Sequence, residues 1–185
     1  TDAQSDFSSL HIEAGATVTM GDDFLDANYV IAEGTLDRSG VLRLQNSVIE
    51  LHGSLGSSIS FLDTNNGTID FYDGASFGNS NMPFEHKGTN TFGYVLSSNG
   101  FSTMYVGGLY GSGWSNVNYD IDISKYDISK GSTIVLVEYA SHLAAYDGAF
   151  DPAAINVYAG DSGLDATLSF DTATSSLVLT VFTAN

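Results

Sequence analysis

The sequence contains no cysteine, only five basic residues and only two prolines among its 185 residues. Without cysteine, the chain can form no disulfide bond and can supply no thiolate ligand to a metal ion. It also has no run of 18 apolar residues, so no membrane insertion by a spanning helix is expected. Strong helix signals are equally scarce, which turns attention to strands.

The scarcity of basic residues limits the possible partners. Twenty-two acidic residues stand against the five bases Arg38, Arg43, Lys87, Lys125 and Lys130, for a formal net charge of −17. A chain without a basic patch cannot neutralise phosphates, so nucleic acid and anionic membrane surfaces are excluded as expected partners. The excess of carboxylates instead fits divalent cations or a salty medium, either of which would screen the self-repulsion.

What the chain does contain favours short strands. Hydrophobic residues make up 43% of it and aromatic residues 12%, too much for a disordered chain. Twenty glycines punctuate stretches that are rich in Thr, Val, Ile, Tyr and Phe. The composition therefore predicts an all-β protein.

Four segments of the first half align with one another. Each is a short apolar stretch that ends in glycine and a small residue, and the aligned glycines are Gly15, Gly34, Gly53 and Gly74. They follow one another at 19, 19 and 21 residues. Internal repeats of this length are typical of stacked architectures, in which no unit buries its apolar face alone.

The repeat predicts a β-solenoid, that is, a β-helix-like fold with coils of about 20 residues. Glycine would permit the positive φ of the corner between two strands. Four unrelated β-hairpins in a sandwich would also place turns at regular intervals, and this alternative stays open at the level of sequence.

The last third has a different pattern. We expect residues 1–116 to form the solenoid and residues 117–185 a β-rich capping region that packs on the same core. Five strands are expected in this region: 118–123, 133–139, 155–158, 165–170 and 177–182. The last of them would close the end of the core. The segment 171–176 would join the final pair as a hairpin loop.

A family resemblance rests on four runs of this region. These are Tyr119-Asp-Ile-Asp-Ile-Ser-Lys-Tyr, Ser132-Thr-Ile-Val-Leu-Val-Glu-Tyr and Asp165-Ala-Thr-Leu-Ser-Phe-Asp-Thr with the strand from Leu177. Their pattern resembles the C-terminal part of secreted microbial surface proteins with β-helical repeats, of the autotransporter-passenger-like and exosortase-sorted types. The resemblance implies an extracellular or cell-surface location and a β-solenoid frame, and it carries no catalytic residue. The sorting tail of such proteins is missing, so anchoring by that route is not implied.

Ca²⁺ is the cofactor that the sequence favours. The segment Asp63-Thr-Asn-Asn-Gly-Thr-Ile-Asp70 places oxygen ligands around a glycine turn, and Asp63, Asn65, Asp70 and Asp73 are the candidate ligands. The spacing is not that of an EF-hand, and an Asn-Asn-Gly turn needs no metal, so this alternative stays open. Asn66-Gly-Thr68 is also an N-glycosylation acceptor sequence.

Catalytic patterns are not found. The four histidines lack metal-ligand spacing, no serine occupies a Gly-x-Ser-x-Gly motif, and acidic pairs are too numerous for one to stand out. No enzyme activity is therefore expected. Tyr105, Tyr110 and Trp114 lie in a glycine-rich stretch where aromatic faces could stack on sugar rings, although such rings also fill protein cores.

Together these observations predict a non-enzymatic extracellular structural protein. We expect a subunit that assembles with itself into a surface layer, filament or matrix, because stacked coils leave strand edges that another copy can pair with. A carbohydrate-binding or adhesion module that uses the three aromatic residues is the alternative. A polysaccharide-active β-helix enzyme is a third and less favoured hypothesis.

Overall fold

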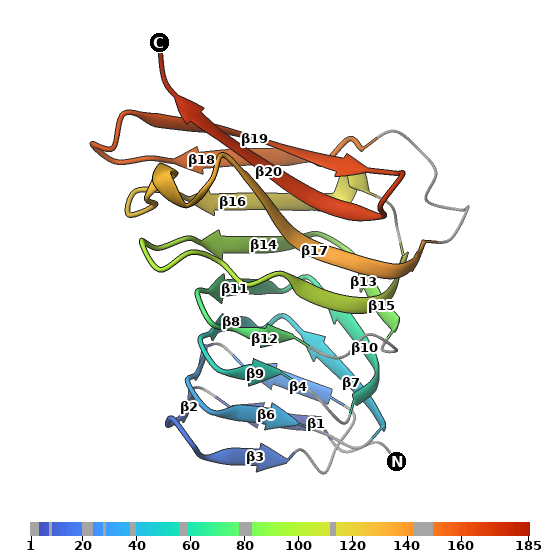
Figure 1. Ribbon diagram of the computed structural model, residues 1–185. Helices are drawn as coiled ribbons and strands as arrows, with labels where there is room; N and C mark the ends of the chain where they lie inside the picture. Colours follow the sequence, from blue (N-terminus) through green and yellow to red (C-terminus); the bar gives the residue numbers. More distant parts are fainter. Residues whose placement is uncertain are drawn as a thin grey trace.

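The computed structural model shows an all-β protein built from stacked, mostly parallel strands (Figure 1). It describes the following residues: 4–7, 9–19, 24–27, 29–37, 40–55, 59–77, 83–111, 114–142 and 150–185. Two short 3₁₀ helices, Trp114–Asn116 and Ile128–Lys130, are the only helical elements among these residues. The expectation of an all-β fold is confirmed.

The strands form three sheets, here sheets A, B and C. Sheet A contains β1 (Gln4–Phe7), β4 (Phe24–Ala27), β7 (Gly40–Gln45), β10 (Ile59–Asn65), β13 (Pro83–Lys87), β15 (Met104–Gly111), β17 (Thr133–His142), β20 (Ser176–Thr183) and β19 (Leu164–Asp171). Sheet B contains β2 (Leu10–Ile12), β5 (Val30–Ala32), β8 (Val48–Leu51), β11 (Thr68–Tyr72), β14 (Asn90–Val95), β16 (Val117–Asp122) and β18 (Ala154–Tyr158). Sheet C contains β3 (Thr17–Thr19), β6 (Thr35–Asp37), β9 (Ser54–Leu55) and β12 (Ser76–Phe77).

The chain visits these sheets in a fixed order. From β1 to β12 it passes through A, B and C in turn. Each passage that begins in sheet A and continues through sheet B, with or without sheet C, is called a circuit below. From β13 to β18 it alternates between A and B, and β19 and β20 then return to A. Every pairing in sheets B and C is parallel, so each strand lies on the strand of the preceding circuit (Figure 1).

Two columns of inward-facing residues form the part of the core that sheet B contributes. The first column is Val30, Ile49, Ile69, Phe92 and Tyr119, and the second is Ile12, Ala32, Leu51, Phe71, Tyr94 and Ile121. All of these residues are buried. Paired residues of the second column are 20, 19 and 20 residues apart in the first circuits, and the last step, from Ile121 to Val157, spans 36. The circuits therefore lengthen toward the C-terminus.

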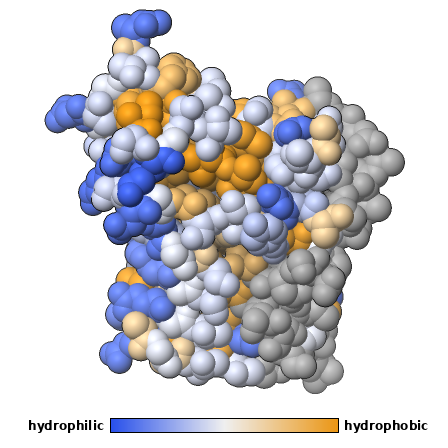
Figure 2. Space-filling view, in the orientation of Figure 1, coloured by the Kyte–Doolittle hydropathy of each residue, from blue (hydrophilic) through white to orange (hydrophobic). Residues whose placement is uncertain are grey.

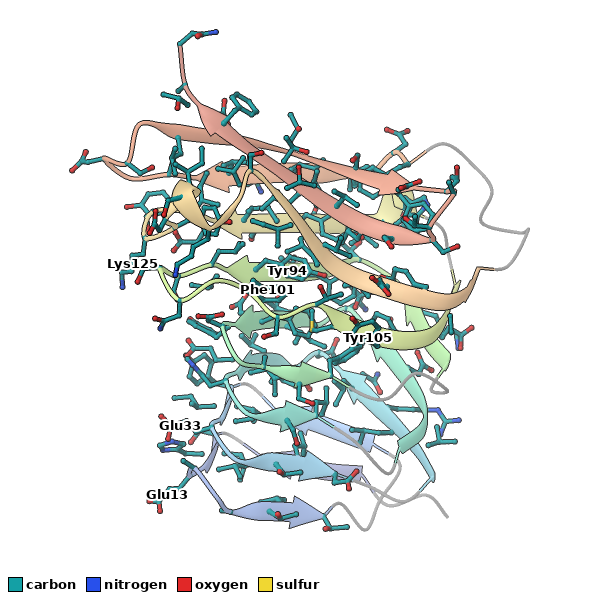
Figure 3. All side chains as sticks on the ribbon, in the orientation of Figure 1. Glu13, Glu33, Tyr94, Phe101, Tyr105 and Lys125 are labelled. Atoms are coloured by element: carbon teal, nitrogen blue, oxygen red, sulfur yellow. The ribbon has the colours of Figure 1, made fainter. Side chains whose placement is uncertain are left out.

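The core residues grow as the circuits lengthen. Aliphatic residues fill the first circuits, whereas aromatic rings fill the middle ones, with the ring centroids of Phe71 and Tyr94 at 5.3 Å and those of Phe92 and Tyr119 at 6.2 Å. Figure 3 shows Tyr94 pointing inward beside Phe101, whose ring lies edge-on to it at 5.9 Å. Aromatic side chains therefore supply much of the buried volume in the middle of the stack.

The repeated corner glycines have two different physical reasons. Gly15 and Gly74 have φ of 82° and 86°, a conformation that favours glycine, as the repeat predicts. Gly34 and Gly53 do not have a positive φ, so the predicted reason is wrong for them. A Cβ at Gly53 would instead collide with the backbone carbonyls of Glu33 and Gly34 in the preceding circuit, so these corners need glycine for close approach.

The strands predicted for the C-terminal third are all present. They correspond to β16, β17, β18, β19 and β20, and β19 and β20 form the expected antiparallel hairpin. Parallel pairing nevertheless continues past the boundary predicted at 116/117, because β16 pairs with β14 and β18 pairs with β16. Antiparallel pairing among the described strands is confined to β20 with β17 and β19, which cross the top of the stack in Figure 1.

The core columns predict a strong effect of a single deletion. Leu51→Ala should lower the free energy of unfolding by about 2–5 kcal/mol, because a fully buried side chain is replaced by a cavity between two circuits. Urea denaturation followed by circular dichroism would measure it. Ser102→Ala, at an exposed loop position, should stay within about 0.5 kcal/mol of the parent protein. Equal effects of the two substitutions would contradict the assignment of Leu51 to the core.

Candidate functional site

A groove of about 440 Å³ crosses the outer face of sheet B. Four neighbouring strands, β11, β14, β16 and β18, contribute its lining. The lining residues combine carboxylates, an amide, an aromatic ring and apolar positions: Asp70, Gly93, Val95, Asp120, Ile121, Asp122, Asn156, Val157 and Tyr158. The groove therefore runs across the strands, along the axis of the stack.

Parallel register brings the central groove residues together although they are far apart in the sequence. Asp70 pairs with Gly93, Gly93 with Asp120, and Asp120 with Asn156. Side chains alternate along a strand, and the residues on either side of Asp70 and of Asp120 are buried. These four residues consequently face outward in one line, which we call the groove column.

Gly93 leaves a gap in the groove column, and the Asp70 carboxylate leans over it. A Cβ at Gly93 would collide with the Asp70 carboxylate oxygen. Partial burial, followed by the nearby charges of Glu50 and Asp120, raises the pKa of Asp70. The groove thus holds one carboxylate whose charge is disfavoured by its surroundings.

Asp120, on the other side of the gap, has a partner. Its Oδ1 accepts a hydrogen bond of 2.8 Å from the Asn156 amide. Asp122 points to the same face two residues later, and its Oδ1 accepts a 2.9 Å hydrogen bond from the backbone N–H of Ser124. Tyr158, beside them on β18, exposes 64% of its surface. The groove therefore offers fixed hydrogen-bond acceptors next to an open aromatic ring.

The same face continues toward the N-terminus with Glu50, which pairs with Asp70 across β8 and β11. Tyr29 donates a hydrogen bond to the Glu50 carboxylate, and this bond is the main cause that raises the pKa of Tyr29 to about 12. The His52 ring lies 3.7 Å from the same carboxylate and stacks on Tyr72 at 3.8 Å. These contacts hold Glu50, so the open part of the acidic face begins at Asp70.

The four predicted calcium ligands do not converge on one point. Asp63 Oδ2 lies 3.3 Å from Lys87 Nζ and 3.9 Å from Arg43 Nε on sheet A, whereas Asp70 lies in the groove of sheet B. Asp73 accepts a 2.6 Å hydrogen bond from the Ser97 hydroxyl, and Asn65 is half-buried in β10. Within the described part of the chain, no three His, Cys, Asp or Glu side chains form a group that could hold a metal ion.

The predicted aromatic platform divides between surface and core. Tyr105 is 52% exposed on β15 and points away from the stack in Figure 3, whereas Trp114 is buried. The Trp114 ring packs against Phe150 and Phe170, with centroids 5.1 and 5.2 Å away, so it has no face free for a sugar. The exposed stacking role predicted for Trp114 is therefore wrong, and the side chain of Tyr110 lies outside the described residues.

The acceptor asparagine of the glycosylation sequence lies at an exposed corner. Asn66 has φ of 53°, and its side-chain oxygen accepts a 3.0 Å hydrogen bond from the backbone N–H of Thr89 in the next circuit. The turn predicted for this sequence is confirmed, and its modification stays a prediction.

Sequence reasoning missed Gly93, Asn156 and Tyr158 as site residues. Asp120 and Asp122 could be placed on one face from their spacing, but no constant repeat leads from Asp70 to Asp120 or onward to Asn156. The paired residues along the groove column are 23, 27 and 36 positions apart. The register of the paired strands, rather than the spacing of residues along the sequence, shows that these residues are neighbours.

Comparisons of the chain with protein-family models, with curated proteins and with solved structures found no match. The resemblance to secreted surface proteins therefore stays a prediction. In the part of the chain that the structure describes, none of the helices has the length and apolar character to cross a membrane.

The raised pKa of Asp70 predicts a stability change with a defined sign. The folded protein binds the Asp70 proton more readily than the unfolded chain, so this group disfavours folding increasingly as pH rises from 3.8 through the raised folded value. Asp70→Asn should therefore raise the urea midpoint near neutral pH and lose this advantage below pH 3.8.

Asp127 provides a control of opposite sign. Hydrogen bonds from Ser129 lower the pKa of Asp127, so Asp127→Asn should not stabilise the protein near neutral pH. A neutral or destabilising effect of Asp70→Asn at that pH would contradict the electrostatic description of the groove.

Proposed function

We propose that this chain is an extracellular β-solenoid that binds polysaccharide in the groove on sheet B. The solenoid interpretation rests on strands that pair in parallel with those of the preceding circuit and on buried columns that run through them. The groove across four of these strands is the observation that carries the binding function.

The chemistry of the groove suits a sugar chain. Asp120, held by Asn156, and Asp122 present fixed acceptors to hydroxyl groups, while Tyr158 offers a ring on which a sugar ring can stack. Because the lining comes from four successive strands, a ligand that extends along the stack would contact all of them.

The proposed role is binding without catalysis. Asp70 and Asp120 are two of several acidic residues on this face, and their positions do not distinguish them as a catalytic acid and base. The described lining residues offer no other pair with such a role. We also propose that Ca²⁺ acts by screening or bridging the acidic surface rather than through the four ligands expected from the sequence.

Tyr158 and Tyr105 provide a matched test, since both are exposed tyrosines but lie on different sheets. Affinity gel electrophoresis against a panel of neutral and acidic polysaccharides should reveal binding by the parent protein. Tyr158→Ala should weaken that binding roughly fivefold, because a stacked ring contributes about 1 kcal/mol. Tyr105→Ala should leave it unchanged.

The reverse result, with loss only in Tyr105→Ala, would place the ligand on sheet A and reject the groove. A parent protein that is retarded by none of the polysaccharides would reject the binding function itself.

Self-assembly into a layer, filament or matrix is a second candidate, and the last core position of sheet B favours it. Ile155 pairs with the buried Tyr119 and continues the first core column, yet it is 39% exposed on β18, the edge strand of the sheet. Figure 2 shows further apolar surface in the upper half of the molecule, in the region of β16 and β17. Another copy could pair with this edge and cover Ile155.

Light scattering after size-exclusion chromatography would test assembly. Millimolar Ca²⁺ should produce larger species than EDTA, because the net charge of −17 opposes association until cations screen it. Ile155→Asp should reduce the larger species, whereas Tyr105→Ala should not. A monomer under both conditions would reject this candidate.

A further inference from the structure

Gly93 lies in the middle of a strand, and its backbone conformation does not require glycine. It lies between the buried Phe92 and Tyr94 of β14, and it is not among the residues with positive φ. A Cβ there would collide with the movable carboxylate of Asp70, in contrast to Gly53, where it would collide with backbone. Glycine inside a strand costs stability and often marks a close approach of a ligand.

The position of Gly93 matches that expectation. It is at the centre of the groove column, with Asp70 on one neighbouring strand and Asp120 on the other. Neighbouring strands are about 4.8 Å apart, so the backbones of these two aspartates are separated by roughly 9.6 Å. Gly93 itself places no side chain in this space, and the group that reaches into it is the movable carboxylate of Asp70. Val95, two residues along β14, continues an apolar floor from the gap.

The charge of the lining limits what can enter the gap. Asp70, Asp120 and Asp122 are acidic, and none of the described residues that line the groove is basic. The raised pKa of Asp70 shows that the site already disfavours negative charge. Lys125 is the next basic residue after β16, in the turn that follows it, and it does not line the groove. A carboxylated sugar would add a negative charge beside three acidic side chains, with no basic side chain among the described lining residues to compensate it.

We infer that the groove binds an uncharged polysaccharide, with one sugar residue seated over Gly93 between Asp70 and Asp120, and that it excludes polyuronates. This inference rests on the proposed polysaccharide binding and specifies its ligand class and its central subsite. The chain would run across β11, β14, β16 and β18 with its hydroxyl groups toward the two aspartates and one ring on Tyr158.

Two pairs of polymers that share a backbone and differ in charge test the ligand class. Fully methyl-esterified homogalacturonan is compared with polygalacturonate, and hydroxyethyl cellulose with carboxymethyl cellulose, by affinity electrophoresis in EDTA at physiological salt. We expect binding to a neutral member, at least about tenfold tighter than to its carboxylated counterpart. Equal or tighter binding of a carboxylated polymer overturns the inference and leaves polysaccharide binding standing, whereas no binding to any polymer in the wider panel rejects both.

Gly93→Ala tests the subsite separately from folding. The added methyl group should displace the Asp70 carboxylate into the groove and weaken binding of the neutral polymer at least about tenfold. The melting temperature should stay equal or rise, because alanine is less costly than glycine within a strand. Thr91→Ala, on the same face of β14 but outside the lining, should change neither property.

Gly53→Ala completes the comparison, since its collision with backbone should lower the melting temperature. Unchanged affinity in Gly93→Ala would overturn the assignment of the gap as a subsite. A melting temperature of Gly93→Ala as low as that of Gly53→Ala would show that Gly93 serves the backbone, and would also overturn it.

Discussion

Lateral hydrogen bonding between parallel strands of successive circuits is the constraint on which the rest of the structure depends. It fixes which residue of one circuit lies on which residue of the next, as when Ala32 lies on Ile12 and Leu51 on Ala32. Because side chains alternate along a strand, the same register that stacks the core residues also stacks the residues between them. The groove column is the outer counterpart of the two core columns.

Stacking residues of one kind has opposite consequences on the two sides of sheet B. Inside, apolar residues on neighbouring strands bury each other, and rings such as Phe71 and Tyr94 pack closely. Outside, Glu50 and Asp70 are neighbours, and like charges at this position are unfavourable. Tyr29 binds Glu50, Asn156 binds Asp120, and Gly93 separates Asp70 from Asp120, so each contact or gap relieves part of the repulsion.

The sequence was sufficient for features that depend on neighbours along the chain. The alternating pattern of residues 177–182 and the loop at 171–176 located the final hairpin, and the Asn-Asn-Gly turn at Asn66 was also found. Burial of Trp114 was one of the two alternatives that the sequence left open, but the rings that cover it were not predictable, because Phe150 and Phe170 are 36 and 56 positions away. The ion pairs of Asp63 were not predictable either, because its partners Arg43 and Lys87 come from the preceding and following strands of sheet A.

The lengthening of the circuits explains why the groove itself was missed. Near the N-terminus a step of 19 or 20 residues leads to the neighbouring strand, and a fixed period finds it. Around the groove the steps are 23, 27 and 36, because longer connections are inserted between the strands. Only the pairing of strands shows that Asp70, Gly93, Asp120 and Asn156 are neighbours.

The alternation of side chains within β14 and β16 also separates the effects of substitutions on the outer face from those in the interior. A substitution at Asp120 alters the outer face, while Tyr119 and Ile121 on either side continue to fill the interior. The chain between two strands of sheet B can also differ in length without changing their register, since β16 and β18 remain paired although Asp120 and Asn156 are 36 positions apart. The chemistry of the outer face of sheet B can therefore change residue by residue while the packing of the interior stays the same.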